Sequence, residues 1–354
     1  MRIRQTVLFV GLTLTLLYSY ITQRTPQPTP PKPQRWEIAF AQPFEVGRQF
    51  SEGLAVIGTG DKYGYIDKTG QVVIQPQFDW ANAFSEGMAC IRINDKEGFI
   101  NQRGEIVVKP KYESVYDFSD GLAFVSLDDR HASYIDKTGK VVLNAKRWDS
   151  VTDFSEGLAA VSGPRDEDPF NYIDHTGKVI ISTPFLGARP FSEGLARVHI
   201  KPEFKSARGY GFIDRTGQVV VSPQFDSIGD KFSDGLVQAL VRGKWGYIDK
   251  TGKMVIEPQF DQADDFSEGI ALVKVAGDYG FVGKDGRYIV KPQFMFASGF
   301  SEGLASVCDR RGKFGYIDRS GNYFIEPQFQ AADSFSEGLA LVSLDGKAFY
   351  IKRR

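Results

Sequence analysis

The chain has few of the residues that build most catalytic and metal sites. Its 354 residues include two cysteines, Cys90 and Cys308, and three histidines, His131, His175 and His199. The cysteines do not indicate a disulfide framework, and we expect both to be buried like small apolar residues. No histidine has metal-ligand spacing to a cysteine or a carboxylate pair, and no nucleophile elbow, Walker loop or calcium loop is present. The sequence therefore predicts no enzyme activity, no cofactor and no metal.

The chain also lacks an excess of positive charge. Residues 36–354 carry 38 basic and 44 acidic side chains. A mildly acidic surface argues against a nucleic-acid partner, because phosphate recognition depends on clustered Lys and Arg.

One long apolar stretch is present, at the N-terminus. Arg2 and Arg4 precede an apolar core at residues 7–17, which extends to Ile21 without a small-residue cleavage box. We expect residues 1–24 to be an uncleaved signal anchor or a cleaved signal peptide, and residues 25–35 to be a proline-rich, extended linker. The body would then be extracytoplasmic, membrane-anchored in the first case and secreted or periplasmic in the second. Membrane contact is expected through this segment only.

The rest of the chain is dominated by nine copies of one phrase, Phe-Ser-(Glu/Asp)-Gly-(Leu/Met/Ile)-(Ala/Val). The copies begin at Phe50, Phe84, Phe118, Phe154, Phe191, Phe232, Phe266, Phe300 and Phe335. Seven of the eight steps between them are 34 to 37 residues, and the remaining one is 41. A period of this length is the signature of a repeat architecture. The fixed phenylalanines are expected to be buried between units.

Each unit reads as a small antiparallel meander. In the first unit, apolar residues 54–57, residues 63–66 and residues 71–74 predict three strands, and a hairpin turn at residues 67–70 joins the last two. Residues 76–78, Pro-Gln-Phe, are expected to end the third strand, because proline cannot donate to a ladder. A short fourth strand fits the connector that leads to the next phrase. The apolar first and third strands predict strands covered on both faces, and no helical period is present.

The two ends of the array complement each other. The last unit stops after its second strand at Ile351, whereas residues 36–40 form a third strand with nothing before it. Split units of this kind close the ring of a β-propeller. The predicted fold is therefore all-β, with nine antiparallel meander repeats of about 34 residues in a propeller-like closed ring. An open β-solenoid is the alternative.

The phrase, the stretch Lys-Trp-Gly-Tyr-Ile-Asp-Lys-Thr-Gly at residues 244–252 and the Pro-Gln-Phe-Asp element together resemble the bacterial WG-repeat family. The resemblance covers residues 36–354. The naming pair is present only at Trp245-Gly246, and other residues replace the tryptophan elsewhere. The resemblance implies a repeat scaffold that binds partners, and it supplies no catalytic residues.

Candidate binding residues lie where the repeat departs from itself, because insertions into repeats form loops on one face. The longest departures are residues 162–170 and 199–208, in adjacent units. They predict a binding lip that is acidic on one side and basic and aromatic on the other. Its residues are Arg165, Asp166, Phe170, His199, Lys201, Phe204, Lys205 and Arg208. The alternative is that these insertions are neutral.

The repeated carboxylate of the phrase is expected to cap its own turn or to pair with a nearby Lys or Arg. We expect a non-catalytic scaffold for protein–protein interaction at the cell envelope. A binder of carbohydrate or cell-wall glycan is the alternative, and an envelope hydrolase is a remote one. Glycan binding would need exposed Tyr or Trp platforms, whereas Phe78, Phe260 and their equivalents are expected to be buried.

Overall fold

The computed structural model describes residues 35–41, 44–128, 131–163, 165, 168–200 and 209–354. Two units are distinguished, Met1–Arg35 and Trp36–Arg354, and only the second is described below. The predicted anchor and most of the linker lie outside the described residues. Within those residues no helix is long and apolar enough to cross a membrane.

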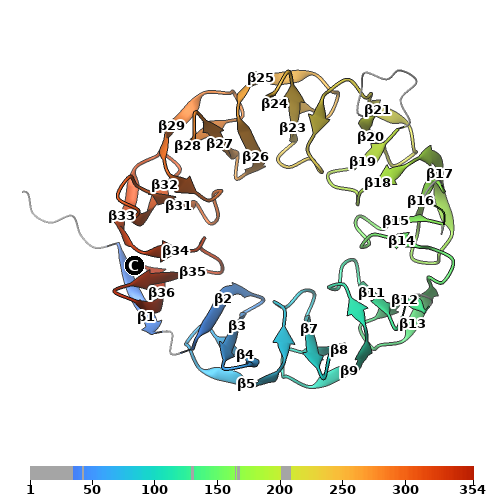
Figure 1. Ribbon diagram of the computed structural model, residues 1–354, viewed down its shortest axis with the longest axis horizontal. Coiled ribbons are helices and arrows are strands. Elements are labelled where there is room, and N and C mark those ends of the chain that lie inside the picture. Colours follow the sequence, from blue (N-terminus) through green and yellow to red (C-terminus); the bar gives the residue numbers. More distant parts are fainter. Residues whose placement is uncertain (1–34, 42–43, 129–130, 164, 166–167, 201–208) are drawn as a thin grey trace, which may run out of the picture. The chain divides into compact units, whose positions relative to one another are not determined.

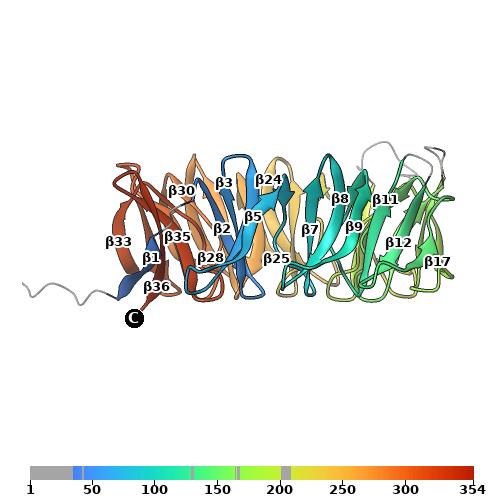
Figure 2. The same ribbon diagram turned by 90° about the horizontal axis from the view of Figure 1, so that it is seen from below.

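Nine four-stranded antiparallel sheets form a closed ring around a central axis (Figure 1). Each sheet is a blade, and blade 1 contains the first phrase. Figure 2 shows the ring edge-on, with the strands running between its two ends. The predicted nine-unit all-β ring is confirmed, and the fold is a nine-bladed β-propeller. The open solenoid is excluded.

The innermost strands lead into the phrases, and most have only two residues. They are β2 (Val46–Ser51), β6 (Trp80–Ala81), β10 (Ser114–Val115), β14 (Ser150–Val151), β18 (Gly187–Ala188), β22 (Ser227–Ile228), β26 (Gln262–Ser267), β30 (Phe296–Ala297) and β34 (Ala331–Ala332). They are the short fourth strand that the connector suggested.

The second strands are the apolar runs after each phrase. They are β3 (Leu54–Thr59), β7 (Met88–Ile93), β11 (Leu122–Ser126), β15 (Ala159–Ser162), β19 (Leu195–His199), β23 (Leu236–Val241), β27 (Ile270–Val275), β31 (Leu304–Cys308) and β35 (Leu339–Leu344). In β3, residues Ala55 to Gly58 are all buried, so these strands are covered on both faces as predicted.

The third strands carry an aromatic–glycine pair in five of the nine blades. They are β4 (Lys62–Asp67), β8 (Lys96–Asn101), β12 (Ala132–Asp136), β16 (Phe170–Ile173), β20 (Tyr210–Asp214), β24 (Lys244–Asp249), β28 (Asp278–Gly283), β32 (Phe314–Asp318) and β36 (Lys347–Arg353). The predicted hairpin turn follows. Gly70 takes a φ of +86° and donates its backbone N–H to the Asp67 carbonyl.

The outermost strands are β5 (Val72–Phe78), β9 (Ile106–Tyr112), β13 (Val141–Asn144), β17 (Val179–Phe185), β21 (Val219–Val221), β25 (Met254–Phe260), β29 (Tyr288–Phe294), β33 (Tyr323–Phe329) and β1 (Trp36–Ala41). Two expectations about them were wrong. Pro76 does not end β5, because an edge strand needs no donor on its outer side, and Phe78 still pairs with Tyr63. The strand is not covered on both faces either, since Val73 is 47% exposed at the ring perimeter.

Blade 9 is assembled from both ends of the chain. Strand β1 pairs antiparallel with β36, with Ile38 opposite Ile351 and Phe40 opposite Tyr350. This confirms the predicted pairing and closes the ring (Figure 1). The pairing covers the edge of β36, and β1 becomes the outermost strand of blade 9, as β5 is in blade 1.

The core lies between neighbouring blades. Each phrase phenylalanine is at most 3% exposed and packs between the facing sides of two neighbouring sheets. The Phe84 ring, for example, packs 5.0 Å from the Tyr65 ring of the preceding blade. The buried phenylalanines confirm the prediction.

The antiparallel order places the connections at two ends of the ring. The phrase turns and the Asp-Lys-Thr-Gly turns share one end, which we name the turn end. The loops between second and third strands, and the connections from one blade to the next, share the opposite end, the loop end. The strand ends that flank the two longest departures from the repeat, Ser162 and Phe170 in blade 4 and His199 and Tyr210 in blade 5, therefore lie at the loop end.

Candidate functional site

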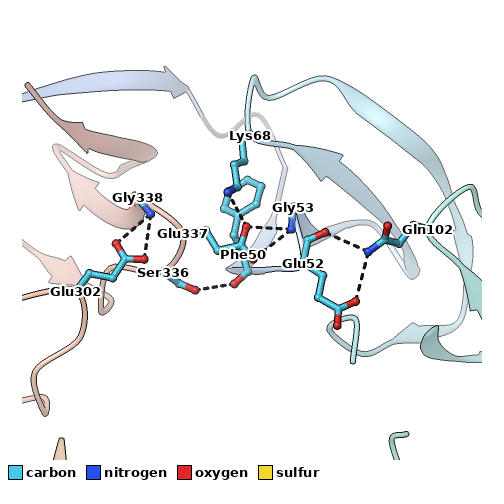
Figure 3. Close-up of polar contacts among 9 residues, drawn as sticks. All are labelled: Phe50, Glu52, Gly53, Lys68, Gln102, Glu302, Ser336, Glu337 and Gly338. Atoms are coloured by element: carbon cyan, nitrogen blue, oxygen red, sulfur yellow. Dashed lines mark hydrogen bonds and ion pairs between the residues drawn. The ribbon is translucent and has the colours of Figure 1, made fainter. Parts of the chain in front are cut away.

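The repeated phrase joins each blade to the next with two hydrogen bonds. The serine hydroxyl donates to the backbone carbonyl of the next blade's phenylalanine in all nine blades, with Ser336 donating to Phe50 across the seam. The phrase carboxylate accepts the backbone N–H of the next blade's phrase glycine, again in all nine. Figure 3 shows the two bonds at the seam.

The hydrogen bond to the next blade explains why the phrase carboxylate keeps an unfavourable backbone conformation. Glu52 has a φ of +53°, as do its equivalents within a few degrees, and a non-glycine residue in this region costs roughly 1–2 kcal/mol. Asparagine tolerates the conformation best, yet a carboxylate makes a stronger, charge-assisted hydrogen bond to a backbone N–H. The carboxylate is kept because it must accept the Gly87 N–H of the next blade, at 2.8 Å.

Several carboxylates have a second partner from the Asp-Lys-Thr-Gly turn. Lys68 pairs with Glu337, Lys137 with Glu86, Arg215 with Glu156 and Lys250 with Glu193. The expected pairing with a nearby Lys or Arg is therefore confirmed at these blades. The expectation that each carboxylate caps its own turn was wrong, since it caps the turn of the next blade. These carboxylates hold the ring together.

At the loop end, where the sequence departs from the repeat, we find a cavity. Phe170 of blade 4 and His199 of blade 5 line one cavity of about 310 Å³. We name it the blade 4/5 pocket, and its lining residues are Phe170, Leu186, Gly187, Ala188, Arg189, Arg197, Val198, His199 and Tyr210. Phe170 and His199, which border the two insertions, are therefore close together.

The other predicted lip residues do not line this cavity. Arg165, five residues before Phe170, is exposed. Its backbone N–H donates a hydrogen bond to the Asp168 carboxylate. Five predicted residues lie outside the described residues: Asp166, Lys201, Phe204, Lys205 and Arg208.

Arg197 is the more buried of the two arginines that line the pocket. Its side chain is only 14% exposed, and its guanidinium lies 4.8 Å from the centre of the Tyr210 ring. It donates to the Ile228 carbonyl at 3.1 Å and to the Asp230 carboxylate at 2.6 Å. Stacking and two hydrogen bonds fix a guanidinium that would otherwise be expensive to bury.

Two matched departures from the repeat create this arrangement. The strand register places Arg197 opposite Phe212, where the other eight second strands have a neutral residue: Val56, Cys90, Phe124, Ala160, Gln238, Leu272, Ser306 or Leu341. Blade 6 has one more residue between its innermost strand and Phe232 than blade 2 has before Phe84. That longer connector carries Asp230, the partner of Arg197.

The pocket therefore combines charged and aromatic side chains. Arg189 and Arg197 supply two guanidinium groups, and Asp230 lies 3.7 Å from the first and 2.6 Å from the second. His199 packs 4.9 Å from the Tyr210 ring. Sequence reasoning missed Arg189, Arg197 and Tyr210. A position-by-position comparison of the nine second strands would have singled out Arg197.

The remaining candidate groups have structural surroundings. Cys90 and Cys308 are free and buried, as expected. Burial raises the pKa of the Cys90 thiol to about 12, so the reactive thiolate is scarce at neutral pH. Within the described part of the chain, no group of three or more His, Cys, Asp and Glu side chains could hold a metal ion.

The WG containing repeat family matches eight stretches that together cover most of the chain: residues 63–96, 98–130, 133–162, 172–201, 210–245, 245–277, 279–313 and 314–347. The chain belongs to the WG-repeat family. Each match runs from a third strand to the second strand of the next blade. The ninth such stretch would have to run through both chain ends, which explains why eight matches correspond to nine blades.

The glycine of the WG repeat has a steric role. A Cβ on Gly246 would lie 2.3 Å from the Ile256 carbonyl oxygen of the outermost strand, close to Pro258. Gly64, Gly98, Gly211, Gly280 and Gly315 face the same obstacle. The outermost strand passes closely over the third strand just before its proline. The aromatic neighbour of this glycine in blade 5 is Tyr210, so the blade 4/5 pocket uses a WG-repeat position.

Three solved structures illustrate the likeness in fold. A eukaryotic initiation factor is 11% identical, with 87% of this chain and 92% of that chain covered and a TM-score of 0.56. The computationally designed Ika8 protein is 14% identical, with coverages of 87% and 98% and a TM-score of 0.47. BamB from Moraxella catarrhalis is 12% identical, with coverages of 86% and 95% and a TM-score of 0.42. No curated protein matched the sequence.

Proposed function

We propose that this WG-repeat protein is a non-catalytic scaffold that binds a protein partner at the cell envelope through the loop end of its propeller. The observation that carries the proposal is the blade 4/5 pocket. The phrase interactions recur in all nine blades and serve the ring itself, whereas Arg197 and the longer connector with Asp230 break the repeat at a single place.

The positions of the aromatic residues support a protein partner over a glycan. Phe78 is 1% exposed and Phe260 is fully buried, as expected. Among the described residues, the exposed large aromatics are Tyr116, Tyr288 and Phe296, which lie in three different blades. Glycan sites use exposed aromatic faces, and these three do not form a shared platform.

The envelope location is proposed from the N-terminal sequence. Residues 1–24 would anchor the chain or direct its export, and the proline-rich residues 25–35 would space the propeller from the membrane. Fractionation of cells that express the chain with and without its first 24 residues tests this. We expect membrane or export-dependent recovery with the segment only. Unprocessed full-length chain in the soluble cytoplasmic fraction would contradict it.

Site-specific photo-crosslinking in the native cells tests the protein partner. A photo-reactive amino acid at Leu186, which is 38% exposed in the pocket wall, should give a discrete adduct with another protein. The same group at Lys253, which is exposed at the turn end, is the matched control and should not. Equal adduct patterns at both positions, or none at Leu186, would exclude the loop end as the binding surface.

A further inference from the structure

We infer that the blade 4/5 pocket binds a carboxylate of a partner peptide, together with the apolar side chain beside that carboxylate. The inference rests on the proposed function, and it names the chemistry that the binding surface recognises.

On the positive side of the pocket, the two arginines outnumber their one carboxylate partner. Arg189 and Arg197 share a single carboxylate, Asp230, at 3.7 and 2.6 Å. The side chain of Arg189 is 54% exposed, so its guanidinium is open to a ligand. Guanidinium groups bind carboxylates through paired, charge-assisted hydrogen bonds. A ligand with one negative charge would complete the balance.

Asp230 already shows that these arginines accept a carboxylate. It reaches them from the longer connector of blade 6, and its side chain is 62% exposed. Its contact with Arg189, at 3.7 Å, is the looser of the two, so Asp230 can give up Arg189 to another carboxylate while it stays on Arg197. Arg197 would stay in place, since its stacking on Tyr210 and its bond to the Ile228 carbonyl do not depend on Asp230. Asp230 is therefore expected to act as an internal competitor.

The other side of the pocket is apolar. Leu186 and the ring of Tyr210 line it from blade 5, and Phe170 lines it from blade 4. Its volume of about 310 Å³ lies at the lower end of the range for small-ligand sites, which suits one or two residues of a peptide. A phosphate carries two negative charges and no apolar part. It would leave an excess negative charge in a half-enclosed site, at a cost in desolvation.

Four short fluorescent peptides test the inference on the purified full-length chain. Two carry an internal Phe-Glu or Phe-Gln pair between capped ends, and two end in Phe with a free carboxylate or an amide. Each acid form should bind about tenfold more tightly than its amide partner, as one charged hydrogen-bonded contact provides. Comparison of the two acid forms shows whether a side chain or a chain terminus supplies the carboxylate.

Three variants locate the binding. Arg189→Gln should weaken the acid peptides about tenfold and leave the amide peptides unchanged. Asp230→Asn should strengthen the acid peptides, because it removes the competing carboxylate. A purely structural ion pair would give unchanged or weaker binding in that variant. Arg242→Gln, an exposed arginine at the loop end of blade 6, is the matched control and should bind like the wild type. Thermal melts verify that each variant is folded.

Three outcomes would overturn the inference: equal binding of acid and amide peptides, unchanged or weaker binding in Asp230→Asn, or stronger binding of inorganic phosphate than of the acid peptides. If the Leu186 crosslink to a protein persists in any of these cases, the proposed function stands and only the ligand chemistry is wrong. If the crosslink is absent while the peptides bind as expected, the inferred ligand chemistry is supported and the proposed protein-binding function is contradicted.

Discussion

The Glu337 carboxylate accepts the backbone N–H of Gly53 at 2.9 Å, across a separation of 284 residues. The same bond joins Glu302 to Gly338 within the continuous array. The seam of the propeller is therefore chemically equivalent to its other blade junctions (Figure 3).

Replacing Glu337 tests that equivalence. Glu337→Ala leaves the Gly53 N–H without its acceptor, and should lower the free energy of unfolding in urea by about 1–3 kcal/mol. Glu337→Gln keeps an acceptor oxygen and should lose less. Glu302→Ala is the matched variant inside the array and should cost about as much as Glu337→Ala. A cost at Glu302 with none at Glu337 would mean that the seam is open in solution.

The phrase phenylalanines should dominate the core. Phe84 is 2% exposed, so Phe84→Ala should cost roughly 3–5 kcal/mol of stability. Phe296 is 57% exposed on the innermost strand of blade 8 and provides the control, since its truncation removes little buried surface. Chemical denaturation compares the two. A loss below about 1 kcal/mol for Phe84→Ala would contradict packing between blades.

The glycine of the naming pair should not tolerate a methyl group. Gly246→Ala would place its Cβ against the Ile256 carbonyl oxygen, and the forced displacement of the outermost strand should cost about 2–3 kcal/mol or more. Gly299→Ala meets no atom within 4 Å and should be nearly neutral. Thermal melts of the two variants measure the difference, and equal melting temperatures would refute the steric role.

Asp264 should destabilise the propeller at neutral pH. Desolvation, followed by the nearby charge of Asp265, raises the pKa of this carboxyl above its unfolded value of about 3.9. The folded state then holds the proton more tightly, so stability falls as pH rises through the folded pKa. Asp264→Asn should be more stable than the wild type at pH 7, and the difference should vanish below about pH 4.

The Asp67 carboxyl should have the opposite effect on stability from Asp264 and stabilise the propeller at neutral pH. The Thr69 hydroxyl, ahead of the backbone N–H donors, lowers the pKa of the Asp67 carboxyl. Its contribution is present above the unfolded pKa and is lost as pH falls through the folded pKa. Asp67→Asn should therefore be less stable than the wild type at pH 7. The same pH dependence in both variants would show that it arises elsewhere in the molecule.

The sequence was sufficient for the architecture because each unit repeats the same local chemistry. Turn glycines, apolar runs and complementary ends determined nine blades and the pairing of residues 36–40 with the last strand. It could not show where Glu52 reaches, because residue types do not reveal which turn of a neighbouring blade comes closest. The continuation of β5 through Pro76 was also hidden, since a proline is tolerated only when the strand lies at an edge.

The pocket could be anticipated from the sequence only in part. Unusual loop length drew attention to Phe170 and His199, which line the same cavity. Arg197 was overlooked because it lies in a regular strand, where a single charge looks like an ordinary surface residue. Its near-complete burial and its pairing with Asp230 depend on the packing of blade 5 against blade 6, which no single repeat contains.

The seam has a mechanical consequence. Trp36 lies opposite Arg353, so the chain enters β1 and leaves β36 at the same end of their ladder. Tension applied through the two chain ends would load the backbone hydrogen bonds of this pair one after another, beginning at Trp36, and would not shear them all together. A ring whose nine junctions are alike at rest would thus unzip first at β1 when it is pulled.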